Sequence, residues 1–220
     1  MTLAMQRRET LAAVRWLLAR GLLTGTSGNV SCRTERGFLI TPTGIPSEEM
    51  AAAQLVEVSL DGQARGPLLP SSEWRLHRDV YRQRPEAGAV VHTHSPFATA
   101  LACLRRPVPS FHYMLAKTGG AQLRCARYAT YGTEALSTNA LAALAGGRRA
   151  CLMANHGLVA LGADLAAARF LAEEVEGLCA QYTIARSLGR PVLLPAREMA
   201  AVGTKFASYG QPDSRPRRRR

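Results

Sequence analysis

Two periods of hydrophobic and polar positions alternate along the chain, one typical of helices and one typical of strands. Residues 2–20 carry apolar side chains on one helical stripe and are followed by Gly21, so we expect a first helix there. The same reasoning predicts further helices in four segments: roughly 71–85, from Pro96 onward, 133–144 and 163–187. Ser71 and Ser72 are residue types that cap helix N-termini, and we expect them to cap the second helix.

Short apolar runs bounded by turn residues predict the strands, at 30–33, 38–41, 56–60, 89–94, 150–154 and 158–161. Asp61 and Gly62 form the turn signal of a hairpin. Because helices and strands alternate while some neighbouring strands are joined by hairpins, the pattern predicts an α/β fold with a mixed sheet and helices on its faces. The 220 residues show no internal repeat or interdomain linker, and this length is typical of a single domain.

The most informative motif is HTH at positions 92–94, which directly follows the apolar run AVV. Residues i and i+2 of a strand point to the same face, so His92 and His94 can converge on one metal ion at the strand end. A catalytic zinc site usually has three protein ligands and one open position. His156, in the turn NHG between two short apolar strands, is the natural third ligand.

Two other histidines leave alternatives. His77 follows Glu73 by four residues on the same predicted helix, so these two side chains can form a different metal pair. That helix lacks the surrounding sequence of a known zinc helix, and we favour the first set. His112 has no assignment from these patterns. The five cysteines are scattered, odd in number and without a CxxC pair, which argues against both a disulfide framework and a thiolate zinc site.

Three short segments rich in small and hydroxyl residues can bind an anion: TSGN at 26–29, TPTG at 41–44 and PSSE at 70–73. Backbone N–H groups of loops and helix starts bind phosphate without lysine, and this chain has only Lys117 and Lys205. Each segment alone is more typical of a turn or a cap. Glu73, directly after the serines, is either an ordinary helix-start carboxylate or a base that takes a proton next to a carbonyl.

The net charge of +12 is typical of a nucleic-acid binder. Five of the arginines lie in the last six residues, RPRRRR, and the remaining charge of about +7 is spread without interleaved aromatic residues. We therefore expect a structured domain over 1–210, a basic, disordered tail over 211–220 and no nucleic-acid partner. With 47% hydrophobic residues, no apolar run of about 18 and no signal-peptide pattern, the sequence predicts a cytoplasmic protein without a membrane partner.

Nine segments stand in one order along the chain: SGNVS, LITPTGIP, LPSSEWRLH, AVVHTHS, HYM, CARYATYGT, NHGLVA, EVEGL and KFASYG. From about Leu11 to Gly210 this series resembles the L-fuculose-1-phosphate aldolases of the class II aldolase/adducin-head family. The HxH and SSE segments recur across that family, whereas HYM and KFxxYG favour the fuculose branch. The resemblance implies a single-domain, three-layer α/β/α sandwich with a mixed central sheet, and an enzyme of the carbon–carbon lyase class.

The resemblance also implies roles for individual residues. His92, His94 and His156 bind Zn²⁺, and Glu73 joins them as a ligand when no substrate is bound. The residues implied to contact the substrate phosphate are Gly28, Asn29, Thr43, Gly44, Ser71 and Ser72. The residues implied as catalytic are Glu73 as acid/base, Tyr113 from a neighbouring subunit as proton donor to the aldehyde oxygen, and Tyr209. Tyr131 and Phe206 help shape the aldehyde pocket, and the assembly is a homotetramer with intersubunit active sites.

The implied reaction is reversible cleavage of a ketose 1-phosphate to dihydroxyacetone phosphate and a short aldehyde. L-Fuculose 1-phosphate, which yields L-lactaldehyde, and close 5-deoxy analogues are the candidate substrates. Two positions depart from the family pattern: Asn155 stands where a histidine is expected, and Tyr131 where a phenylalanine is expected. The second departure falls on the aldehyde side and leaves the identity of the aldehyde open.

Cleavage of this kind needs an electron sink, either a lysine Schiff base or a Lewis-acid metal. Neither lysine lies in a predicted buried strand, which favours the metal. The alternatives are a 4-epimerase, dehydratase or decarboxylase on the same scaffold, a non-catalytic adducin-like binding module, and a nucleic-acid binder that uses the tail. The KFxxYG end favours the aldolase, and the complete histidine set with Glu73 argues against a binding module.

Overall fold

The computed structural model describes residues 2–209. Its helices are α1 (Leu3–Ala19), α2 (Trp74–Gln83), α3 (Pro96–Cys103), α4 (Glu134–Leu144), α5 (Leu165–Leu188) and α6 (Ala196–Ala207), with the short 3-10 helices η1 (Ala52–Gln54) and η2 (Tyr113–Thr118). Its strands are β1 (Asn29–Thr34), β2 (Gly37–Ile40), β3 (Val56–Val58), β4 (Ala64–Arg65), β5 (Ala89–Thr93), β6 (Cys125–Ala126), β7 (Ala150–Met153) and β8 (Gly157–Gly162).

The strands form one eight-stranded sheet in the order β4-β3-β2-β1-β5-β8-β7-β6. Strands β6 and β7 run parallel, whereas the other neighbouring pairs are antiparallel. Hairpins join β1 to β2, β3 to β4 and β7 to β8, and the turn at Asp61 and Gly62 was predicted from the sequence. Strand β5 lies in the middle of the sheet, between β1 and β8, and all of its residues are buried.

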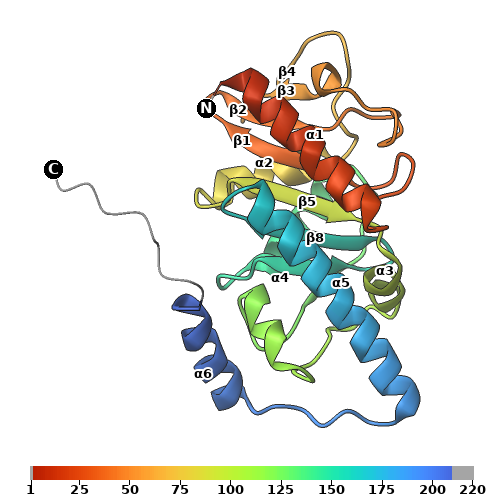
Figure 1. Cartoon of the computed structure of the whole chain (residues 1–220), viewed down its shortest axis with the longest axis vertical. Helices are drawn as coiled ribbons and strands as arrows, with labels where there is room; N and C mark the ends of the chain where they lie inside the picture. Colours follow the sequence, from red (N-terminus) through yellow and green to blue (C-terminus); the bar gives the residue numbers. More distant parts are fainter. Residues whose placement is uncertain (1, 210–220) are drawn as a thin grey trace, which may run out of the picture.

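Helices cover both faces of the sheet (Figure 1). Helices α1, α3 and α5 pack on one face, where Leu17 and Val175 share a core with Val91 of β5. Helices α2 and α4 pack on the other face, where Val80 shares a core with Val90. Successive residues of a strand point to opposite faces, so β5 contributes to both cores. The predicted three-layer α/β/α sandwich with a mixed sheet is confirmed.

The prediction that Ser71 and Ser72 cap the second helix is wrong. Helix α2 begins at Trp74 and Glu73 occupies its N-cap position, so both serines precede the helix. The backbone N–H of Ser71 instead donates to the carbonyl of Thr41 at 2.9 Å, and its hydroxyl accepts from the N–H of Glu73 at 3.3 Å. Ser71 therefore takes part in a contact between two loops and does not occupy the cap position of this helix.

Several elements were not predicted from the sequence. Strands β4 and β6 have two residues each, too few to show a period. Helix α6 was also not predicted, and its Met199 is buried among residues of the larger core. The strand expected over 56–60 ends at Val58, because Ser59 begins the turn and accepts the N–H of Gly62 at 2.9 Å.

Three further expectations concern the cysteines, the C-terminal tail and membrane-spanning helices. All five cysteines are free thiols, and Cys32, Cys151 and Cys179 are buried, as expected for small apolar side chains. The tail predicted over 211–220 lies outside the described residues, so the division at residue 210 stays a prediction. Among residues 2–209, no helix combines the length and the apolar character needed to cross a bilayer.

A carboxylate from α5 holds the chain just after β5. Glu176 accepts the hydroxyl of Ser95 at 2.7 Å and the backbone N–H groups of Phe97 and Ala98, each at 2.8 Å. These two N–H groups belong to the first turn of α3, where a helix offers them no partner of its own. Glu176 thus caps α3 from a distant segment and fixes the backbone next to His94.

We expect Glu176→Ala to lower the free energy of unfolding by about 2 kcal/mol, because it removes charge-assisted hydrogen bonds at a helix start. Urea unfolding followed by circular dichroism measures the change. Glu173→Ala is the matched control on the same helix: it removes an ion pair with Arg20 whose side chains are 42% exposed, and we expect a loss below about 0.5 kcal/mol. Equal losses in the two variants would contradict the capping role.

Candidate metal centre and active site

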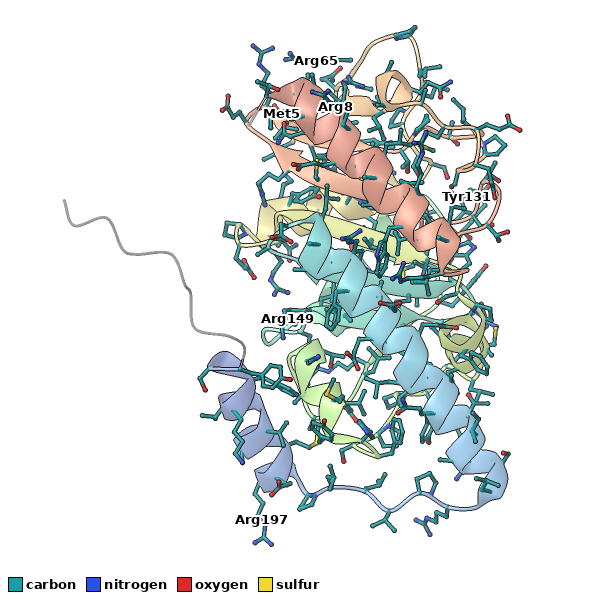
Figure 2. All side chains as sticks on the ribbon, in the orientation of Figure 1. Met5, Arg8, Arg65, Tyr131, Arg149 and Arg197 are labelled. Carbon is teal, nitrogen blue, oxygen red and sulfur yellow. The ribbon has the colours of Figure 1, made fainter. Side chains whose placement is uncertain are left out.

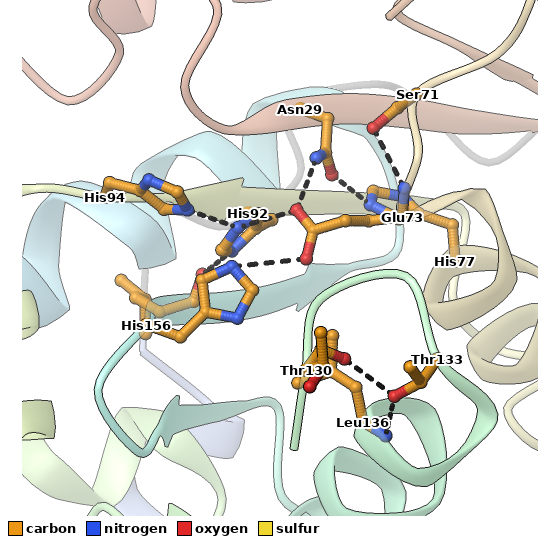
Figure 3. A network of polar contacts seen from close by, with 11 residues as sticks. Asn29, Ser71, Glu73, His77, His92, His94, Thr130, Thr133, Leu136 and His156 are labelled. Atoms are coloured by element: carbon orange, nitrogen blue, oxygen red, sulfur yellow. Dashed lines mark hydrogen bonds and ion pairs between the residues drawn. The ribbon is translucent and has the colours of Figure 1, made fainter. Parts of the chain in front are cut away.

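Three imidazoles and a carboxylate converge at the end of β5 (Figure 3). One ligand atom from each of Glu73, His92, His94 and His156 lies within 4.8 Å of all the others. The Nε2 atom of His92 is 3.0 Å from Nε2 of His94 and 3.1 Å from Oε2 of Glu73. The Nε2 atom of His156 is 3.2 Å from Oε1 of Glu73. The structure thus brings together the four residues that the sequence predicted as metal ligands.

The antiparallel pairing of β5 with β8 places His156 beside the other two histidines. Thr93 of β5 pairs with Leu158 of β8, so the turn that precedes β8 lies next to the end of β5. A Cβ atom on Gly157 would lie 2.3 Å from the carbonyl oxygen of Thr93 and 3.1 Å from the ring of His94. Glycine after His156 is therefore required for the close approach of the two strand ends.

The donor atoms fit a divalent metal ion. The Nδ1–H of His92 donates to the carbonyl of Leu158 at 2.9 Å, which directs the lone pair of Nε2 into the cluster. The Oε1 atom of Glu73 is buried and has no hydrogen-bond partner within the part of the chain that the structure describes. A cation held by the imidazoles and the carboxylate would satisfy these atoms, and nitrogen with oxygen donors is a set that suits zinc and similar ions.

The electrostatics of the cluster favour the ligand forms of Glu73, His94 and His156. Burial by itself raises the pKa of Glu73, but the interactions with His92 and His156 outweigh it and hold that pKa well below its usual range. Burial, reinforced by the charge of His92, lowers the pKa of His94 and of His156 to about 4. Burial also acts to lower the pKa of His92, and the Glu73 carboxylate reverses the effect and raises it. A positive charge next to Nε2 of His92 is thus favoured, as a metal ion would provide.

One pocket of about 300 Å³ adjoins the cluster and unites the three segments predicted to bind an anion. Its lining includes Gly28, Asn29, Thr43, Gly44, Ser71, Ser72, Glu73, His94, Tyr131 and His156. Backbone hydrogen bonds join two of these segments, from Thr43 N–H to the carbonyl of Leu69 at 3.2 Å and from Ser71 N–H to that of Thr41 at 2.9 Å. The pocket therefore combines hydroxyl groups, glycine-rich loops and candidate metal ligands.

Two features of the pocket were not predicted from the sequence. Tyr128 also lines it, and the guanidinium of Arg105 lies 5.5 Å from the Tyr128 ring centroid. The Nε–H of Arg105 donates to the side-chain oxygen of Asn155, and both residues have left-handed backbone, with φ of 54° and 53°. Asparagine tolerates this conformation, so the Asn-His-Gly tripeptide carries a turn signal that could have indicated the geometry before His156.

Three aromatic residues predicted for the aldehyde side form a separate group within the same chain. The ring of Tyr113 stacks on that of Phe206 with centroids 6.2 Å apart, and Phe206 lies 6.0 Å from Tyr209. Phe206 and Tyr209 line a different pocket, together with Gly162. Gly162 pairs with Ala89, the first residue of β5, at the end of the strand away from the histidines.

The two pockets therefore open at opposite ends of β5. In Figure 2, Tyr131 of the first pocket and Arg149 of the second lie on opposite sides of the molecule. Both lysines are also remote from the histidines: Lys117 pairs with Glu174 at 3.2 Å and lines the second pocket, and Lys205 lies on α6. Within one chain, neither lysine is placed to form a Schiff base next to Glu73.

The fold and the cluster of three histidines with one glutamate are those of a class II aldolase. Residues 8–183 match the family described as Class II Aldolase and Adducin N-terminal domain. This is more than half of the chain, and the protein belongs to that family. It is a class II aldolase, a lyase, and such aldolases are metal-dependent enzymes.

Characterised relatives are similar over nearly the whole chain. A 5-methylthioribulose-1-phosphate/5-deoxyribulose-1-phosphate aldolase of Rhodospirillum rubrum is 49% identical over 93% of this chain and 92% of its own. An L-fuculose phosphate aldolase of Escherichia coli O6:H1 is 46% identical over 86% of this chain and 88% of its own. A solved structure of an L-fuculose 1-phosphate aldolase superposes with a TM-score of 0.88 at 40% identity, covering 92% of this chain and 96% of that one.

We expect Gly157→Ala to weaken metal binding by at least about tenfold, because the added methyl group forces the His156 turn away from β5. Titration of the metal-free protein with zinc, followed by measurement of bound metal, tests this. Gly177→Ala, in α5 where an added Cβ meets nothing within 4 Å, is the matched control and should bind zinc like the parent protein. Undiminished affinity in Gly157→Ala would show that the site does not depend on this close approach.

Proposed function

We propose that this class II aldolase reversibly cleaves a ketose 1-phosphate to dihydroxyacetone phosphate and a short aldehyde, with Zn²⁺ as its metal. The observation that carries the proposal is one pocket of about 300 Å³ shared by the His/Glu cluster and the three glycine- and hydroxyl-rich segments. A molecule with a phosphate at one end and a carbonyl a few bonds away suits both parts of this pocket. The substrates in the relatives' names, 5-deoxyribulose 1-phosphate and L-fuculose phosphate, support the same class.

The phosphate subsite uses neutral donors. Thr43 and Gly44 border the pocket from one loop, Ser71 and Ser72 from the segment before α2, and Asn29 from the start of β1. We propose that backbone N–H groups and hydroxyls of these residues, with Gly28, hold the phosphate oxygens. The N-terminus of α2 adds a favourable dipole, so a lysine is not required.

Glu73 is the group that we propose for proton transfer at C3 of dihydroxyacetone phosphate. Its carboxylate is buried, ionised and held by the side-chain N–H of Asn29 at 3.0 Å. In the aldol direction it accepts a proton from the carbon next to the carbonyl, and in cleavage it returns that proton. A divalent ion held by the three histidines would supply the Lewis acid that stabilises negative charge on the carbonyl oxygen.

The aldehyde side of the pocket involves more than one subunit in our proposal. Tyr131 lines the pocket and is 66% exposed, and His94 is exposed as well. Near the opposite end of β5, the side chains of Tyr113 and Tyr209 are 48% and 80% exposed. We propose that a homotetramer apposes these two ends, so that Tyr113 protonates the aldehyde oxygen while Tyr209 and Phe206 complete the aldehyde pocket.

The experiment that tests the function is incubation of the zinc-loaded protein with L-fuculose 1-phosphate, 5-deoxyribulose 1-phosphate and 5-methylthioribulose 1-phosphate. We expect release of dihydroxyacetone phosphate and an aldehyde from at least one of them.

Glu73→Gln should lose at least about 100-fold in the exchange of the C3 proton of dihydroxyacetone phosphate with deuterium, because it lacks the base. Isomerisation without cleavage would instead indicate a 4-epimerase, and no turnover by the parent protein would contradict the proposal.

A complementation experiment tests the intersubunit site. Tyr113→Phe should slow carbon–carbon cleavage strongly and leave C3 proton exchange nearly intact, because exchange involves no aldehyde. Mixing inactive Tyr113→Phe with inactive Glu73→Gln should then restore part of the cleavage activity, since mixed assemblies contain sites with both native residues. If mass spectrometry confirms subunit exchange and no activity returns, Tyr113 does not act across a subunit boundary.

A further inference from the structure

A chain of buried hydrogen bonds runs from Glu73 away from the pocket and through the sheet–helix interface. The side-chain nitrogen of Asn29 donates to Oε2 of Glu73 at 3.0 Å, and its oxygen meets Nε2 of His77. On the other side of the ring, Nδ1 of His77 is 2.6 Å from the hydroxyl of Ser31, which is 2.7 Å from the hydroxyl of Tyr81. All five side chains are at most 5% exposed.

The ionised carboxylate of Glu73 sets the direction of every hydrogen bond in this network. An ionised carboxylate only accepts hydrogen bonds, so Asn29 must turn its NH₂ group to Glu73 and its oxygen to His77. That oxygen needs a donor, so Nε2 of His77 carries the proton and Nδ1 accepts from Ser31. Ser31 has then used its only proton and accepts from the hydroxyl of Tyr81.

The neutral state of the His77 ring agrees with this direction. The ring is fully buried, and burial lowers the pKa of His77 to about 3. A neutral imidazole has one N–H and one acceptor nitrogen, which is what Asn29 on one side and Ser31 on the other require. Figure 3 shows His77 on the side of Asn29 away from His94 and His156. His77 is thus not part of the metal cluster, although it follows Glu73 by one helical turn.

The orientation of Asn29 matters because its amide borders the pocket. Asn29 lines the pocket, and its NH₂ group has two hydrogens, of which one is used by Glu73. In this orientation the amide presents a donor to the carboxylate and keeps a second donor for an anion. The flipped amide would present its oxygen to the carboxylate and to the anion, and both contacts would become repulsive. The Glu73 carboxylate contacts the amide on one side, and the Nε2–H of His77 adds the second contact that holds this orientation from the other side.

We propose that His77 is a positioning residue whose Nε2–H holds the Asn29 amide with its NH₂ group toward Glu73 and the anion-binding pocket. The inference rests on the proposed function, because it assigns the pocket to a phosphate and Glu73 to proton transfer. His77 itself touches neither substrate nor metal. It acts by keeping Asn29 in the one orientation that serves both negatively charged groups.

The test compares two variants at position 77. In His77→Gln the side-chain amide nitrogen replaces Nε2 and can still donate to Asn29, whereas His77→Leu fills a similar space and cannot donate. We expect His77→Leu to bind inorganic phosphate about tenfold or more weakly and to lose a similar factor in C3 proton exchange, the value of one hydrogen bond to a charged group. His77→Gln should recover most of both, and both variants should retain their full zinc content.

Tyr81→Phe is the matched control. It removes a buried hydroxyl from the far end of the same chain of hydrogen bonds and leaves the Nε2–H of His77 in place. We expect phosphate binding and proton exchange within about twofold of the parent protein, even if the free energy of unfolding falls by about 1 kcal/mol. If Tyr81→Phe lowers phosphate affinity as much as His77→Leu, or if Gln and Leu at position 77 are equivalent, the positioning role is wrong.

A measurement on the unaltered protein keeps the inference testable if His77→Leu does not fold. Long-range proton–nitrogen NMR spectra of the zinc-loaded protein should show His77 neutral, with its proton on Nε2 and not on Nδ1. The Nδ1–H tautomer would overturn the proposal. Failure of the proposed function is distinguishable, because the parent protein would then show no proton exchange or cleavage, whatever the tautomer of His77.

Discussion

The structure depends on one buried carboxylate that faces three imidazoles. The ligand atoms of Glu73, His92, His94 and His156 lie within 4.8 Å of one another at the end of a central strand. Lone pairs gathered this closely repel one another unless a positive charge lies among them. The rest of the site follows from this constraint: it demands a cation, it keeps Glu73 ionised, and an ionised Glu73 determines how Asn29 is turned.

The scaffold meets this constraint with contacts between segments that are distant in the sequence. Strand β5 is buried on both faces and pairs with β8, which carries the His156 turn to the end of β5. Gly157 lets the two strand ends approach, and Glu176 of α5 fixes the chain immediately after His94. On the other side, Asn29 at the start of β1 pairs with His92 and links the metal cluster to the anion-binding loops. The His/Glu cluster and the proposed phosphate subsite therefore share one rigid support.

A single chain holds only part of the machinery that we propose. The metal ligands and the anion-binding loops lie at one end of β5, whereas Tyr113, Phe206 and Tyr209 gather near the other. An arrangement of this kind separates two tasks of an aldolase. In our proposal, binding and deprotonation of dihydroxyacetone phosphate need one end of a chain, and selection of the aldehyde requires the opposite end of a neighbouring chain.

The sequence by itself predicted the α/β fold, the mixed sheet and the three histidines that cluster, because each of these predictions rests on a local pattern. His92 and His94 share a face through the two-residue period of a strand, and a turn between apolar strands carries His156. Only the tertiary structure decided three other contacts. Ser71 takes part in a contact between two loops, and Arg105 donates a hydrogen bond to Asn155 in the turn before His156. The ring of His77 forms a hydrogen bond with Asn29 and does not join the histidines that face Glu73. These contacts join residues tens of positions apart. Their partners are selected by packing of whole elements, and no periodicity within a short segment encodes them.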